Sequence, residues 1–133
     1  MRIGIAVVES QGACLVGRRG PEGPLPGYHE FPGGKLLEGE APEAGAVREC
    51  LEESGLEVRA VGRLTECVHE YPHGRLELTF VLCEPVSPGP RPTAGRFDWV
   101  EFENLGGLNF PEANAGALAA LRDRHPAAPA GGI

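Results

Sequence analysis

The sequence has little positive charge for its size. Its 133 residues carry 12 Lys and Arg against 19 Asp and Glu, which gives a formal net charge of −7. Affinity for nucleic acids comes mostly from basic side chains that neutralise phosphates, so this balance disfavours a nucleic-acid partner. A small polyphosphate is compatible with the same balance when metal ions supply the positive charge.

Closely spaced cysteines and a long apolar run are also absent. No C-x-x-C pair indicates a zinc or redox centre, and the cysteines lie far apart beside apolar residues: Cys14, Cys50, Cys67 and Cys83. We expect buried thiols in a reducing compartment. Residues 1–8 have neither the basic start nor the cleavage site of a secretion signal, and no run reaches the length of a membrane span. The sequence therefore predicts a cytoplasmic protein without a membrane partner.

Strand, turn and helix signals alternate along a chain of the size of one domain. The expected elements are a hairpin over 3–19, a Pro- and Gly-rich loop over 20–29, a helix over Pro42–Ser54, two strands over 57–71 and 75–85, a strand over 96–102 and a helix over 112–124. This order predicts an α/β fold in which helices cover the faces of a mixed sheet. We expect one domain over 1–125 and a disordered tail over 126–133, which has too few apolar side chains to bury.

The expected middle helix ends with the stretch RECLEESG, residues 48–55. Residues three and four apart share a helical face, so Glu49, Glu52 and Glu53 project together. Magnesium prefers several carboxylate oxygens together with phosphate oxygens and water, and Arg48 can hold one acid in a bidentate pair. Gly45, one turn earlier, costs about 1 kcal/mol relative to alanine and leaves space beside the acids. The alternative is an ordinary solvated helix surface, since exposed like charges cost only a few tenths of a kcal/mol.

Upstream of this helix, the stretch EFPGGK contains a Gly-Gly turn whose backbone can approach a ligand closely. Gly34, Glu40 and the segment 48–56, with five residues between the first two and seven between Glu40 and Arg48, resemble the Nudix box, with every charged and glycine position filled. The departure is Cys50, which stands where the family has an aliphatic residue. The order of the strands and helices resembles the Nudix order over about residues 2–124.

The resemblance to Nudix enzymes implies an α/β/α sandwich with a mixed central sheet and a magnesium- or manganese-dependent hydrolysis of a nucleoside diphosphate linked to another group. It makes Glu49, Glu52 and Glu53 metal ligands, together with the Gly33 carbonyl. Arg48 would orient Glu49, and Glu40 would organise the loop before the helix. A metal-activated water would attack phosphorus, with one of the three helix glutamates as general base.

Outside the box, the stretches GRRG, EFPGGK and LNFPEAN resemble the MutT-like branch, which cleaves nucleoside triphosphates to monophosphate and pyrophosphate. By that resemblance Arg19 and Phe31 would line the nucleotide pocket. Lys35 would lie near the phosphates, and Asn114 would bind the base edge. Phe31 is alternatively a core residue, and Asn114 alternatively caps the last helix. The expected partner is a small-molecule nucleotide, and the expected assembly is a monomer or a homodimer.

Two departures concern the substrate. His73 and Gly74 stand where the enzyme of this branch that removes oxidised guanine nucleotides has Asp-Arg, so the sequence does not predict a preference for 8-oxo-dGTP. Thr93 falls near the place of an acidic loop residue of the relatives. Two alternatives stay open: a Nudix hydrolase for ADP-ribose, a diadenosine polyphosphate or a nucleotide sugar, and a non-catalytic nucleotide-binding module. Such modules tend to lose box acids, whereas this chain keeps them.

Overall fold

The computed structural model describes residues 1–87 and 93–125. The expected tail over 126–133 lies outside the described residues, so its disorder stays a prediction. The elements are β1 (Arg2–Ser10), β2 (Ala13–Arg18), β3 (His29–Glu30), β4 (Gly33–Lys35), α1 (Pro42–Ser54), β5 (Val58–Tyr71), β6 (Gly74–Pro85), β7 (Phe97–Glu101), the 3-10 turns η1 (Phe102–Gly107) and η2 (Glu112–Asn114), and α2 (Ala115–Arg124). No helix in the described ranges is both long and apolar enough to cross a membrane.

Among the described residues, seven strands form one mixed sheet. Its main path runs β3-β2-β1-β6-β5, with β4 paired to β1 and β7 paired to β2. The pair of β1 and β6 is parallel, whereas the hairpins β1–β2 and β5–β6 are antiparallel. The mixed sheet is the one that the sequence predicts.

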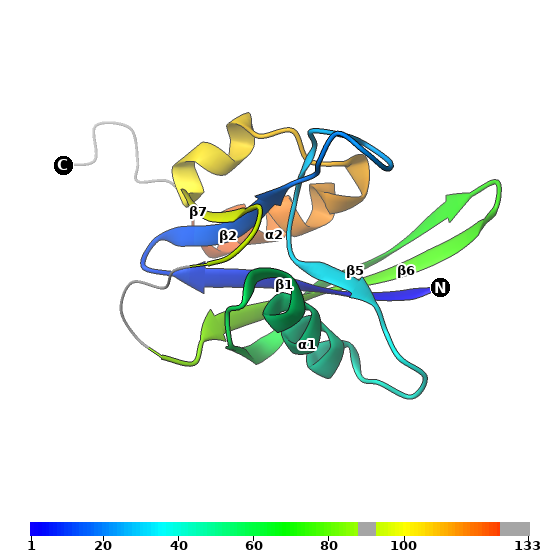
Figure 1. The fold of residues 1–133 in the computed structure, drawn as a ribbon, viewed down its shortest axis with the longest axis horizontal. Coiled ribbons are helices and arrows are strands. Elements are labelled where there is room, and N and C mark those ends of the chain that lie inside the picture. Colours follow the sequence, from blue (N-terminus) through cyan, green and yellow to red (C-terminus); the bar gives the residue numbers. More distant parts are fainter. Residues whose placement is uncertain (88–92, 126–133) are drawn as a thin grey trace.

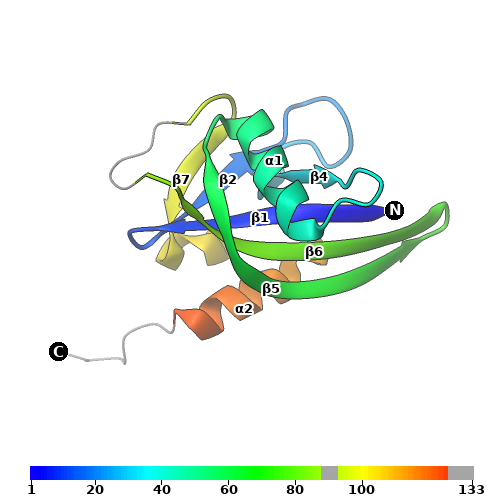
Figure 2. The ribbon, with the colours of Figure 1, turned by 90° about the horizontal axis from the view of Figure 1, so that it is seen from below.

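The two helices cover opposite faces of this sheet (Figure 1, Figure 2). Side chains alternate along β1, as they must in a strand. Ile5 and Val7 belong to the buried cluster on the side of α2, and Ala6 and Val8 belong to the cluster on the side of α1. Both faces of β1 are therefore buried, which confirms the predicted α/β/α sandwich.

The helix α1 has the predicted bounds for the predicted reasons. Pro42 stands in its first turn, where a missing N–H costs nothing. Gly55 ends the helix in the left-handed conformation, with φ 75°, and its N–H donates to the Leu51 carbonyl at 2.9 Å. This end fixes how far the acidic face of α1 extends.

The last helix begins later than predicted. Residues 112–114 wind as the 3-10 turn η2, in which the Asn114 N–H donates to the Pro111 carbonyl at 3.0 Å, and α2 starts at Ala115. Tight 3-10 turns are common where a helix begins, and Pro111 favours this entry because it cannot donate a helical hydrogen bond. Ala117 and Leu121 are the buried residues of α2, and they lie four positions apart on one face, as in an amphipathic helix.

The short strand β4 was not predicted, because a Gly-Gly-Lys run is typical of a turn. It pairs antiparallel with Ile3, Gly4 and Ile5 of β1. A Cβ at Gly33 would lie 2.7 Å from the Gly4 carbonyl oxygen, closer than real Cβ atoms come. Glycine therefore lets the segment before α1 join the sheet, and this places the Gly-Gly pair beside the helix.

All four cysteines are free thiols. Cys14, Cys50 and Cys83 are buried as expected, and burial raises the pKa of Cys14 and of Cys83 to about 12. Cys67 differs from the prediction because it is only half-buried, with its Sγ 3.6 Å from the Ala113 carbonyl oxygen. The edge strand β5, from which Cys67 projects, is not covered along its whole length.

Gly55→Ala should lower the free energy of unfolding by about 1–2 kcal/mol, because an L-residue in the left-handed region is strained. Gly62→Ala is the control, since Gly62 has no positive φ and a Cβ there meets nothing within 4 Å. Urea unfolding of the two variants checks this. Equal stabilities would show that the end of α1 does not depend on the Gly55 conformation.

Candidate active site

Arg48 is the centre of an ion-pair network at the acidic face of α1. Its Nε and Nη2 donate to the two carboxylate oxygens of Glu40, each at 2.9 Å. Its Nη1 donates to Glu49 at 3.1 Å and to Glu52 at 3.3 Å, and its Nη2 also donates to the Lys35 carbonyl at 3.2 Å. One guanidinium therefore joins β4, the loop before α1 and two of the helix acids.

Glu40 fixes that loop from its other side. Its Oε1 accepts the Leu37 N–H at 2.9 Å as well as the bond from Arg48. Hydrogen bonds from the Arg48 guanidinium and from the Leu37 amide lower the pKa of Glu40 to about 2, and Glu40 in turn raises the pKa of Arg48. Glu40 therefore occupies the organising position that the box resemblance implies for it.

Gly34 leaves room for a carboxylate. A Cβ on Gly34 would lie 2.7 Å from both Cδ and Oε1 of Glu49, so only glycine at this position allows the Glu49 carboxylate to lie against β4. The side chain of Glu49 is 16% exposed, whereas that of Glu52 is 57% exposed. Glu49 is thus set into a preformed recess at the edge of β4, and Glu52 stands in solvent.

Gly45 does not have the role expected of it. A Cβ on Gly45 would meet the Leu36 Cδ2 at 2.2 Å and the Glu40 Oε1 at 3.0 Å. The space that this glycine leaves is therefore filled by the loop before α1, and it is not held open beside the acidic face. Gly45 allows close packing of Leu36 and Glu40 on the helix.

Glu53 has a different environment from the other two acids. Its Oε1 accepts the Gly33 N–H at 2.8 Å, and its Oε2 lies 3.5 Å from Nη2 of Arg96. Burial raises the pKa of Glu53 and the charges of Glu30 and Glu49 add to this, while the Gly33 N–H and Arg96 act against it. Gly33 thus contacts Glu53 through its N–H, whereas the resemblance implies that its carbonyl is a metal ligand.

Arg96 and Glu30 were not predicted as site residues. Glu30 accepts bonds from Arg96 Nε at 2.9 Å and from Arg19 Nε at 3.0 Å. Arg96 lies just before β7, Glu30 lies in β3 and Arg19 lies just after β2, so only the tertiary structure brings them together. A sequence signal for Arg96 is its position, because it is a charged residue directly before the apolar strand β7.

Of the four predicted substrate residues, Arg19 and Lys35 lie at the surface, and Phe31 and Asn114 are buried. Arg19 is linked to the acidic face through Glu30, and Lys35 is exposed at the end of β4. Phe31 is 4% exposed and stacks on Phe110 at 4.9 Å between ring centroids, in the core on the side of α2. Asn114 is 9% exposed, makes no side-chain cap to α2, and donates from Nδ2 to the Pro111 carbonyl at 3.4 Å.

The acids of α1 do not converge on one point. Within residues 1–87 and 93–125, no three His, Cys, Asp or Glu side chains form a group that could hold a metal ion. Arg48 engages Glu49 and Glu52, while Gly33 and Arg96 engage Glu53. The donor chemistry still fits a hard divalent cation, because the ligands are carboxylate oxygens on one helical face and Gly34 preserves the recess for one of them.

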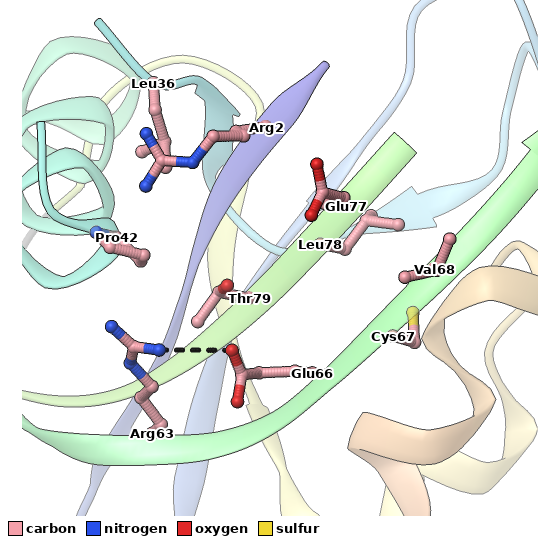
Figure 3. Close-up of a pocket in the computed structure, with 10 residues that line it drawn as sticks. All are labelled: Arg2, Leu36, Pro42, Arg63, Glu66, Cys67, Val68, Glu77, Leu78 and Thr79. Carbon is pink, nitrogen blue, oxygen red and sulfur yellow. Dashed lines mark hydrogen bonds and ion pairs between the residues drawn. The ribbon is translucent and has the colours of Figure 1, made fainter. Parts of the chain in front are cut away.

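A pocket of about 380 Å³ lies on the side of the sheet that α1 covers, beside the first turn of this helix (Figure 3). Arg2 and Glu77 stand at one end, Arg63 and Glu66 form an ion pair of 3.1 Å at the other, and Thr79 lies between them. A second pocket of about 620 Å³ lies between η1 and α2. In the described part of the chain, neither pocket is lined by a helix glutamate of the acidic face, so we assign the site from its carboxylates.

The NUDIX domain family model matches residues 4–120. An 8-oxo-dGTP diphosphatase of Escherichia coli (strain K12) is 28% identical over 124 residues, which cover 92% of this chain and 96% of that protein. An 8-oxo-dGTP diphosphatase of Proteus vulgaris is 32% identical over 76 residues, which cover 57% of this chain and 68% of that protein.

Solved structures show the same architecture. The MutT NUDIX hydrolase from Burkholderia pseudomallei has a TM-score of 0.75 at 22% identity, covering 90% of this chain and 96% of that one. The solution structure of the E. coli ORF135 protein has a TM-score of 0.73 at 23% identity, covering 95% and 93%. These likenesses confirm the fold that the sequence predicts.

Glu40→Gln should remove stability that depends on pH. The pKa of Glu40 is about 2 in the folded protein and near 4.5 when unfolded, so its contribution is complete above pH 4.5 and is lost as the pH falls toward 2. Unfolding by urea at several pH values should therefore show a deficit of the variant at pH 6 that closes at pH 2–3. Glu84→Gln, at an exposed pair with Arg59, is the charge-matched control. A deficit that stays constant with pH would contradict the ion-pair assignment.

Proposed function

The chain belongs to the Nudix family of hydrolases, and from this premise we propose that it is a divalent-metal-dependent enzyme that cleaves a nucleoside triphosphate to monophosphate and pyrophosphate. The observation that carries the proposal is the complete acidic face of α1, with Arg48 joining Glu40, Glu49 and Glu52. A binding module would not need three carboxylates gathered beside a backbone recess. The relatives named 8-oxo-dGTP diphosphatase support a triphosphate as substrate.

The residues that would hold magnesium or manganese are Glu49, Glu52, Glu53 and the Gly33 carbonyl. When bound, such a cation lowers the pKa of a water molecule and offsets the charge that develops on the phosphate groups. The recess at Gly34 and the oxygen-only donor set support this assignment.

The protein's own groups orient the acids. Arg48 keeps Glu49 and Glu52 on one side of α1, and Glu40 prevents the guanidinium from turning away, since it occupies Nε and Nη2. The Gly33 N–H holds one oxygen of Glu53 at 2.8 Å and leaves the other directed toward Arg96. A carboxylate held in this way can accept a proton from the attacking water without first losing rotational freedom.

For the nucleotide we propose Arg19 as a residue that lines its pocket, Lys35 as a cation near the phosphates and Asn114 as a contact to the base edge. The Asn114 Nδ2 donates to the Pro111 carbonyl. The same side-chain amide also carries an oxygen, which is able to accept a hydrogen bond from a base. Phe31, which is buried against Phe110, shapes the pocket wall from within the core and does not offer an open face for stacking.

The proposed role is sanitation of the nucleotide pool or housekeeping turnover of nucleotides. We place the activity in the cytoplasm because the four thiols are free, which suits a reducing compartment. His73 lies in the exposed turn between β5 and β6 and Gly74 begins β6, and they replace the Asp-Arg of the enzyme that prefers oxidised guanine. We therefore expect no strong selectivity for 8-oxo-dGTP over dGTP.

Pyrophosphate release tests the proposal directly. The purified protein is given canonical and oxidised nucleoside triphosphates, ADP-ribose and diadenosine polyphosphates, with magnesium and with EDTA. We expect release from at least one triphosphate, and a fall of at least about 100-fold in EDTA. Cleavage of ADP-ribose alone would overturn the triphosphate assignment, and binding of a nucleotide without any turnover would favour the non-catalytic module.

Glu53→Gln should lower kcat/KM by at least about 100-fold, because the amide can still accept the Gly33 N–H but cannot bind a cation or take a proton as a carboxylate does. Glu57→Gln, an exposed acid just past α1, is the matched control and should keep full activity. Thermal unfolding should show both variants folded. Full activity of Glu53→Gln would remove Glu53 from the site.

A further inference from the structure

The segment before β7 is fixed on the carboxyl-terminal end of α1. The Ala94 N–H donates to the Ser54 carbonyl at 2.8 Å. Gly95 turns the chain with φ 69°, and a Cβ there would lie 3.7 Å from the Glu53 carbonyl oxygen. These main-chain contacts bring the next residue, Arg96, beside the Glu53 side chain.

Arg96 is held more firmly by Glu30 than by Glu53. Its Nε and Nη2 both donate to Oε2 of Glu30, the former at 2.9 Å, and its guanidinium lies over the Phe97 ring at 5.0 Å. The contact with Glu53 is longer, at 3.5 Å. Arg96 can therefore release Glu53 and keep its position.

The charges around Glu53 explain when Arg96 would leave this contact. Glu30 and Glu49 both act on Glu53 with like charge, and Arg96 offsets them. If Glu53 held a divalent cation, that cation would compensate the same charges. The Arg96 side chain is 43% exposed, so its positive charge then faces solvent beside the cation, where a polyphosphate arrives. Arginine binds phosphate oxygens well, because its planar fork can donate two parallel hydrogen bonds.

We propose that Arg96 is a substrate-binding residue for the polyphosphate, held in place by Glu30, which exchanges its contact with Glu53 for a phosphate oxygen once the cation is bound. The inference rests on the proposed function. It adds to the site the positively charged side chain of Arg96, which is not part of the Nudix box. This side chain lies on the side of Glu53 that Arg48 does not reach in this structure.

Arg96→Gln tests this with two measurements. The kcat/KM for the best triphosphate should fall about 10- to 100-fold, the loss expected for a hydrogen bond to a charged group. Calorimetric titration with Mn²⁺ alone, without nucleotide, should give an affinity that is unchanged or a few-fold tighter, because one positive charge near the cation is gone. Arg96→Lys should recover part of the activity, since it keeps the charge.

The control is Arg59→Gln, which makes the same change in net charge at an exposed pair with Glu84 on the β5–β6 hairpin. It should leave both measurements unchanged. With an active wild type, an unchanged kcat/KM in both Arg96 variants would overturn the inference alone. A parallel weakening of Mn²⁺ affinity would also overturn it, by showing that Arg96 serves to position Glu53. A wild type without pyrophosphate release overturns the proposed function, and the inference with it.

Discussion

Charge compensation by Arg48 is the constraint on which the site depends. Glu40 lies in the loop before α1, and Glu49 and Glu52 lie in the last two turns of the helix. Without Arg48, these three carboxylates would repel one another. Arg48 gives Nε and Nη2 to Glu40 and Nη1 to the two helix acids, so a single guanidinium satisfies all three. Because Glu40 also accepts the Leu37 N–H, the same ion pair fixes the loop that leads from β4 into the helix. A lysine could not replace it, since its single ammonium lacks the planar fork.

Close backbone approach makes this compensation possible. Gly33 lets β4 pair with β1, and Gly34 leaves the recess in which the Glu49 carboxylate lies. The acids can therefore reach backbone groups of β4, as the bond from Gly33 N–H to Glu53 shows. On the opposite side, Arg96 and Glu30 complete the network, so each helix acid has a guanidinium group near it. The acidic face is held in a stable arrangement that a divalent cation can take over.

Local signals predicted the parts of the protein that depend on local structure. Pro42 and Gly55 gave the bounds of α1, and the spacing of its glutamates gave the acidic face, because helical geometry alone decides both. Arg96 could not be found in this way, since its contacts with Glu30 and Glu53 join three segments far apart in the sequence. The role predicted for Gly45, to leave space beside the acids, was wrong for the same reason. The sequence shows that a glycine leaves space at this position, and only the fold shows that Leu36 and Glu40 fill it.

The central claim is that this acidic face binds a divalent cation, and a crystal structure with Mn²⁺ tests it most directly. Anomalous scattering locates the metal without reference to any assumed chemistry. We expect an anomalous peak within ligand distance of the carboxylates of Glu49, Glu52 and Glu53, with the Arg48–Glu40 pair unchanged. Manganese bound elsewhere, or a peak that touches none of these three carboxylates, would contradict the account.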